Sequence, residues 1–147
     1  MVYSANKKAT NKITPCNQSL IRQNIMKKIL FIEDESALQK AVSDFLNQED
    51  FKVVSALDGE TGLRMAKSEA PDLILLDLIL PKLNGFEVLK ELSVDEKTKK
   101  IPVIVLTNLE GVEDIKKALE LGATTYLIKE DHRLEEVAEK IKKALGQ

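Results

Sequence analysis

The sequence has few of the residues that mark covalent cross-links, zinc sites or membrane segments. Its 147 residues include one cysteine, Cys16, so no disulfide can form within the chain, which fits a reducing cytoplasm. His132 is the only histidine, and without a partner cysteine a zinc site is not expected. No apolar run approaches the roughly 20 residues that a membrane-spanning helix needs. We therefore expect a cytoplasmic protein without a membrane partner.

Acidic residues are missing from the first 32 residues, which carry six lysines or arginines, whereas the remainder carries a net charge of −8. The basic segment has no helical or strand period and lacks the apolar core of a secretory signal. Met26, followed by two lysines, looks like a natural chain start. We expect residues 1–25 to be a disordered basic tail or a start-site artefact, and residues 26–147 to form one domain. An acidic domain offers no footprint for nucleic acid.

The sequence does contain apolar runs that end in polar groups. Leu73–Leu76, bounded by prolines, reads as a strand buried on both faces, and it ends at Asp77. Three other runs end in Glu33-Asp34, in Thr107 and in Lys129. If these strands are parallel, their ends share the edge of the sheet where open parallel sheets place their ligands. We expect an acidic pocket there, with one hydroxyl and one ammonium group on its rim.

Such a pocket can perform a limited set of reactions. Three crowded carboxylates repel one another and favour a hard divalent cation, usually Mg²⁺. With phosphoryl oxygens held by the cation, Asp77 can attack phosphorus and form an acyl phosphate. Lys129 would neutralise part of the transferred charge, and the Thr107 hydroxyl would donate to a phosphoryl oxygen.

These residues resemble the receiver domain of response regulators, of the single-domain kind. The matching segments are Ile32-Glu33-Asp34-Glu35, Leu76–Pro81 with Asn84-Gly85, Leu106-Thr107 and Tyr126–Lys129. The resemblance implies that Asp77 is the phosphoacceptor and that Glu33 and Asp34 are the acidic pair. It also implies that Mg²⁺ is bound by these carboxylates and the Ile79 backbone carbonyl, with Lys129 as the phosphoryl partner. Thr107 and Tyr126 would be the switch pair.

The resemblance also implies partners and an output. A sensor histidine kinase or phosphotransfer protein would donate the phosphoryl group, and an unknown downstream protein would read a surface of the fourth helix, fifth strand and fifth helix. The chain would then be no enzyme beyond its own phosphorylation and dephosphorylation. Since only Gln147 follows Gly146, we expect a stand-alone receiver without an output domain.

Two positions depart from the family's pattern. The lysine is usually followed by a proline with a cis peptide bond, whereas Glu130 follows Lys129 here. A cis bond without proline costs about 2.5–4 kcal/mol, so we expect a trans or strained loop. The residue after the switch hydroxyl is usually small, and here it is Asn108. We expect Ile79, Asn108 and Leu109 to line the approach of water to phosphorus and to slow the loss of the phosphoryl group.

Apolar spacing predicts helices between the strands. One stripe, with Ser36 as its possible cap, comprises Leu38, Ala41, Val42, Phe45 and Leu46, and another, which Gly146 ends, comprises Leu134, Val137, Ala138, Ile141 and Leu145. His132 is expected to be a solvated residue at the start of the last helix. Shorter helices should follow Asp58-Gly59, Asn84-Gly85 and Glu110-Gly111. Five βα units imply a doubly wound five-stranded parallel sheet with helices on both faces. The resemblance adds the flavodoxin-like strand order 2-1-3-4-5.

Two other classes of function share parts of this pattern. A phosphatase of the haloacid-dehalogenase type also uses an aspartate nucleophile and Mg²⁺, but it needs a second aspartate where this chain has Ile79. A flavodoxin-like binding module would need a glycine-rich or hydroxyl-rich phosphate loop after the first strand, where Glu33-Asp34-Glu35 would repel phosphate instead. The pattern therefore favours a phosphorylation-driven signalling switch.

Overall fold

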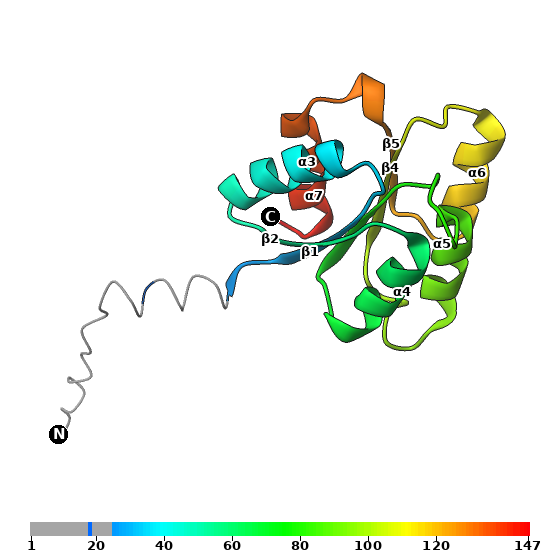
Figure 1. Ribbon diagram of the computed structural model, residues 1–147, viewed down its shortest axis with the longest axis horizontal. Coiled ribbons are helices and arrows are strands. Elements are labelled where there is room, and N and C mark those ends of the chain that lie inside the picture. Colours follow the sequence, from blue (N-terminus) through cyan, green and yellow to red (C-terminus); the bar gives the residue numbers. More distant parts are fainter. Residues whose placement is uncertain (1–17, 19–24) are drawn as a thin grey trace.

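The computed structural model describes residue 18 and residues 25–147, shown in colour in Figure 1. Apart from residues 18 and 25, the expected tail or start-site artefact at residues 1–25 lies outside the described residues.

Five parallel strands form one sheet in the order β2-β1-β3-β4-β5, as predicted. Their bounds are β1 (Lys28–Ile32), β2 (Lys52–Ala56), β3 (Leu73–Leu76), β4 (Val103–Thr107) and β5 (Thr125–Ile128). β3 lies at the centre of the sheet, and all four of its residues are buried, as its apolar run predicts. β4 begins two residues after the start of its apolar run, because Pro102 has no N–H to donate, although its carbonyl accepts from Ile74.

Helices cover both faces of the sheet (Figure 1). α3 (Ser36–Gln48) and α7 (Leu134–Ala144) lie on one face, and α4 (Gly59–Ser68), α5 (Gly85–Val94) and α6 (Val112–Glu120) lie on the other. Neighbouring residues of a strand point to opposite cores: Phe31 packs in the cluster under α3 and α7, and Ile32 in the cluster under α4 and α5. The strands are apolar throughout because both of their faces are covered.

The helix ends differ from the prediction at one position. Ser36 is the first residue of α3 rather than its cap, and the cap residue Glu35 makes no side-chain bond to the helix. Two of the shorter helices start at the pairs from which they were predicted: Asp58 accepts from the N–H of Thr61 at α4, and Asn84 accepts from the N–H of Glu87 at α5. Gly146, with a φ of 77°, follows the end of α7 as predicted.

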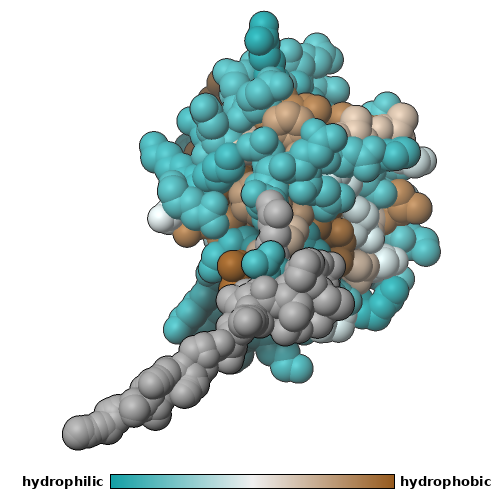
Figure 2. Space-filling view, turned by 90° about the vertical axis from the view of Figure 1, so that its left-hand side faces the viewer, coloured by the Kyte–Doolittle hydropathy of each residue, from teal (hydrophilic) through white to brown (hydrophobic). Residues whose placement is uncertain are grey.

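The surface of the described part is mainly hydrophilic on the face shown in Figure 2, with scattered apolar areas between polar side chains. None of the described helices is both long enough and apolar enough to span a membrane.

Candidate functional site

The candidate residues meet at the carboxyl edge of the sheet, where β1, β3, β4 and β5 end. The parallel register sets Ile32 beside Leu76 and Thr107 beside Ile128. The residues that follow these positions therefore enter one pocket from different strands. The structure thus brings together the acidic pair Glu33-Asp34, the carboxylate Asp77 and the ammonium group of Lys129.

Three carboxylates form the acidic part of the pocket. Oxygen atoms of Glu33, Asp34 and Asp77 all lie within 4.8 Å of one another. Glu33 and Asp77 are buried, with exposed fractions of 0% and 4%, whereas Asp34 is exposed and leaves the pocket open to solvent. Glu33 Oε1 is buried and forms an ion pair with the Lys129 ammonium group. Three carboxylates that offer oxygen ligands so close together fit a hard divalent cation such as Mg²⁺.

Lys129 supplies the positive charge of the site. Its Nζ lies 2.8 Å from Asp77 Oδ2 and 2.5 Å from Glu33 Oε1, and its side chain is 14% exposed. Burial by itself would lower the pKa of Lys129, but the hydrogen bonds and charges of Asp77 and Glu33 outweigh burial and raise it. Burial raises the pKa of the Glu33 carboxyl, although Lys129 and the N–H of Glu35 stabilise its charged form.

The backbone around Asp77 is tightly held. Its N–H donates to the Ile32 carbonyl at 3.1 Å, and its Oδ1 accepts from the N–H of Ile79 at 3.2 Å. Gly85 packs against this segment so closely that an added Cβ would lie 2.5 Å from the Asp77 carbonyl oxygen. The sequence predicted a short helix after the Asn84-Gly85 pair, but this close approach was not predicted.

The two proposed switch residues both contact the backbone of Leu109. The Thr107 hydroxyl, which is fully buried, accepts from the Leu109 N–H at 3.4 Å. The Tyr126 hydroxyl donates to the Leu109 carbonyl at 2.8 Å. Burial, with added repulsion from Asp114 and Asp77, raises the pKa of Tyr126 to about 12. One peptide segment after β4 therefore joins the hydroxyl at the pocket to the aromatic ring on β5.

The three residues expected to line the approach of water differ in exposure. Ile79 is 56% exposed and Asn108 is exposed, whereas Leu109 is partly buried and packs against the core under α4, α5 and α6.

The segment after β5 differs from the sequence-based expectation at His132. Lys129–Asp131 forms a short 3₁₀ turn, η1, and no peptide bond in the described part of the chain is cis, so the Lys129–Glu130 bond is trans. His132 was expected to be a solvated residue in the first turn of the last helix. Instead it precedes α7, is partly buried, and its Nδ1 lies 3.0 Å from the Ile128 carbonyl oxygen.

Comparisons with known proteins agree with this geometry. The profile of the family described as response regulator receiver domain matches residues 29–142. The transcriptional regulatory protein CiaR of Streptococcus pneumoniae is 50% identical over 105 residues, which are 71% of this chain and 45% of that protein. This chain spans less than half the length of that relative.

Solved structures of similar fold include a CheY-like receiver domain from Methanospirillum hungatei, with a TM-score of 0.77 and 27% identity over 82% of this chain and 94% of that one. Another is the receiver domain of the sensor histidine kinase PA1611 from Pseudomonas aeruginosa, with a TM-score of 0.76 and 27% identity over 83% and 99% of the two chains. That structure has a magnesium ion coordinated in its active-site cleft. The strand order, the acidic cluster and the family match together show that this chain belongs to the response regulator receiver domain family of two-component signalling.

Proposed function

We propose that the chain is a phosphorylation-dependent signalling switch in which Asp77 accepts the phosphoryl group. The observation that carries this proposal is the buried Asp77 carboxylate at the end of β3, which lies 2.8 Å from the Lys129 ammonium group and beside two further carboxylates. A sensor histidine kinase or phosphotransfer protein donates the group from a phosphohistidine.

In the transfer step an Asp77 oxygen forms a bond to phosphorus while the bond between phosphorus and the imidazole nitrogen of the donor breaks. The electron pair of that bond returns to the imidazole, and the product on this chain is an acyl phosphate. The Ile79 N–H holds one oxygen of Asp77, and Lys129 neutralises charge on the transferred group.

Mg²⁺, bound by Asp34, Asp77 and the Ile79 carbonyl with Glu33 beside them, would neutralise and orient the phosphoryl oxygens. Glu33, the other member of the acidic pair, is fully buried and pairs with Lys129.

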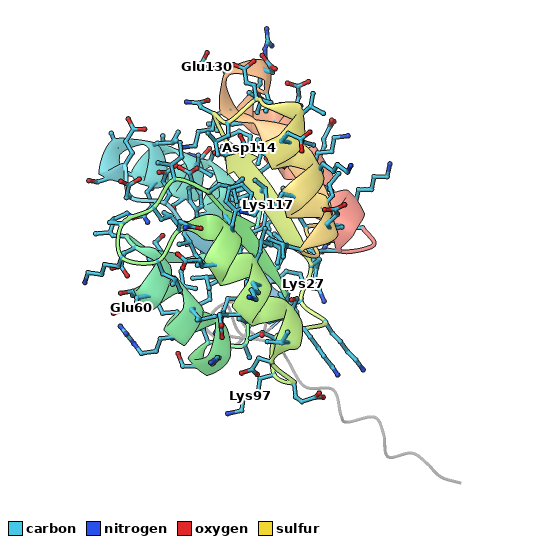
Figure 3. All side chains as sticks on the ribbon, turned by 90° about the vertical axis from the view of Figure 1, so that its right-hand side faces the viewer. Lys27, Glu60, Lys97, Asp114, Lys117 and Glu130 are labelled. Atoms are coloured by element: carbon cyan, nitrogen blue, oxygen red, sulfur yellow. The ribbon has the colours of Figure 1, made fainter. Side chains whose placement is uncertain are left out.

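The switch begins at Thr107. When its hydroxyl turns to donate to a phosphoryl oxygen, it gives up the bond that it accepts from the Leu109 N–H. Tyr126 holds the carbonyl of the same residue, so the loop between β4 and α6 and the ring on β5 respond together. The surface formed by α6, β5 and α7 then changes between two states that a downstream protein distinguishes. Figure 3 shows Asp114 and Lys117 on α6, one of the three elements of this surface.

The first test is phosphorylation by acetyl phosphate with Mg²⁺, followed by intact-mass spectrometry. The wild type should gain one base-labile phosphoryl group without continuous turnover of acetyl phosphate. Asp77→Asn should gain none, because the amide has the shape of the carboxylate but is not a nucleophile. Asp44→Asn, a change on the exposed side of α3, should behave as the wild type. Full phosphorylation of the Asp77→Asn variant would overturn the assignment.

The domain organisation stays a prediction. We propose that residues 26–147 suffice for the switch, which is tested by phosphorylating that fragment. Immunoblotting of the endogenous protein would give its mass, and a mass well above that of this chain would contradict the stand-alone organisation. A beryllofluoride-loaded sample used as bait would identify the downstream protein, since the signalling proposal requires a partner that binds this form more tightly than the unloaded form.

A further inference from the structure

The turn that carries Lys129 has few internal constraints. η1 contains only three residues, and a 3₁₀ turn of this length has poor hydrogen-bond geometry. Its cap residue Ile128 has no side-chain bond to the turn, and Glu130 and Asp131 are both exposed. Figure 3 shows Glu130 at the outer end of the molecule, beyond the sheet. Apart from the ion pairs of the Lys129 side chain, the turn therefore depends on contacts from outside itself to hold its backbone in one place.

His132 provides such a contact. Its Nδ1 lies 3.0 Å from the carbonyl oxygen of Ile128, four residues earlier, so the ring closes the turn over Lys129, Glu130 and Asp131. A carbonyl oxygen can only accept a hydrogen bond, so Nδ1 must carry the hydrogen.

One end of this bond belongs to a strand, and the other lies just before a helix. Ile128 is the last residue of β5 and pairs with Thr107 in the ladder with β4. On the other side, the N–H of Arg133, the residue after His132, donates to Glu136 Oε1 at 2.8 Å at the start of α7. The bond therefore ties the start of the last helix to the end of the strand next to the switch hydroxyl.

We propose that His132 is a positioning residue: its Nδ1–H bond to Ile128 closes the η1 turn and directs Lys129 toward Asp77 and Glu33. The lysine side chain has four rotatable bonds, so the position of its ammonium group depends on where the turn places its backbone. This proposal rests on the role of Lys129 in the proposed function.

The first test is the tautomer of the ring. His132 is the only histidine in the 147-residue sequence, so the imidazole ¹⁵N signals of this labelled chain belong to it alone. The neutral ring should carry its hydrogen on Nδ1. A neutral ring with its hydrogen on Nε2 would overturn the proposal, because the Ile128 bond could not form.

The second test compares His132→Asn with His132→Leu. The two side chains have nearly the same shape, but the asparagine amide nitrogen is bonded to Cγ as Nδ1 is, and leucine has no donor. Phosphorylation by acetyl phosphate should slow about three- to tenfold in the leucine variant. The asparagine variant should stay close to the wild-type rate, as should Glu130→Ala, the control in the same turn.

Calorimetric titration with Mg²⁺ separates positioning from a general loss of structure. Lys129 is a positive charge beside the acidic cluster, so a displaced lysine should leave Mg²⁺ affinity unchanged or increased while phosphorylation slows. A leucine variant in which phosphorylation, Mg²⁺ affinity and melting temperature all fall together would contradict positioning. If that variant does not fold, His132→Ala replaces it in the same comparison.

Lys129→Ala distinguishes the failure of this proposal from the failure of the proposed function. If Lys129→Ala is phosphorylated at the wild-type rate, the proposed role of Lys129 is wrong. If Lys129→Ala is slow but His132→Leu is as fast as the wild type, only the role of His132 is wrong. Equal slowing by the asparagine and leucine variants would also contradict the hydrogen bond, because it would show that the ring itself is needed.

Discussion

At the scale of single residues, the charges of the pocket are only partly balanced. Glu33, Asp34 and Asp77 bring three carboxylates together, and Lys129 is the ammonium group paired with two of them. The raised pKa of Glu33 is a consequence of burial in this crowded pocket. Added positive charge at the pocket therefore relieves repulsion that the lysine alone does not remove, which is the electrostatic basis for expecting Mg²⁺ there. The cation would in turn offset the negative charge of an incoming phosphoryl group.

Tyr126 should make the free energy of unfolding depend on pH in the alkaline range. Its folded pKa of about 12 lies above the ordinary value of 10.0, so its contribution to stability is complete below the unfolded value and is lost as pH rises toward the folded one. At neutral pH, Tyr126→Phe should lose about 0.5–1.5 kcal/mol for the bond to Leu109. At about pH 11, between the two pKa values, the wild type should lose stability relative to the variant. The difference in free energy of unfolding between the two proteins should therefore be smaller than at neutral pH.

Urea unfolding of the wild type and Tyr126→Phe at both pH values measures this difference, and Tyr3 is common to both proteins. A difference that stays constant between the two pH values would show that the Tyr126 pKa is not raised.

Ile79 should influence the lifetime of the acyl phosphate. Its side chain is 56% exposed beside the phosphoacceptor and cannot orient a water molecule by hydrogen bonding. We expect slow self-dephosphorylation in the wild type and faster loss in Ile79→Asn, measured by mass spectrometry after removal of acetyl phosphate. Adding Leu109→Glu should speed the loss further. Loss of the wild-type phosphoryl group within seconds, or no acceleration in the double variant, would contradict this steric argument.

At the scale of elements, the start of α5 supports the phosphoacceptor segment. Asn84 caps the helix, and the Gly85 N–H donates to the Leu78 carbonyl at 2.9 Å. The α4 start approaches the same loop, since the Gly59 N–H donates to the Pro81 carbonyl at 3.3 Å. Two helix starts therefore hold the loop that would supply the Ile79 carbonyl to a cation.

Gly85→Ala should disturb this support. The added Cβ would lie 2.5 Å from both the Asp77 carbonyl oxygen and the Leu78 Cα, so backbone must move. We expect a loss of about 1–3 kcal/mol in urea unfolding and slower phosphorylation. Gly111→Ala is the matched control, because its nearest neighbour is the Asp114 carboxylate at 3.1 Å, which can rotate away. Equal effects of the two substitutions would show that the close approach at Gly85 is unimportant.

At the scale of the whole molecule, the acidic cluster should couple folding to metal binding. The cluster is formed by residues that directly follow β1 and β3, so the unfolded chain does not present it. Mg²⁺ should therefore raise the melting temperature, and at a hundred times its Kd it would add about 2.7 kcal/mol to the free energy of unfolding. Asp34→Ala should remove most of this response, whereas Asp44→Ala should keep it. An unchanged response in Asp34→Ala would place the metal elsewhere.

The architecture and the identity of the charged groups in the pocket follow from the sequence alone. Leu73–Leu76 has to be covered on both faces because it is apolar throughout, and this requirement leads to a parallel sheet between helices. Once the strands are parallel, Asp77 and Lys129 must leave the sheet at the same edge. The resemblance to receiver domains added the strand order, which periodicity does not contain.

The contacts between these groups depend instead on how the chain packs in three dimensions. Lys129 reaches Asp77 across 52 positions of sequence, and the Tyr126 hydroxyl meets the Leu109 carbonyl across 17. The close approach of Gly85 to Asp77 likewise depends on how the loop folds back. Even the local bond from His132 to Ile128 was not predicted, because it depends on a 3₁₀ turn that has no apolar period. Local patterns report which face of an element is buried, whereas these contacts depend on strand register and loop conformation, which are set when the elements pack.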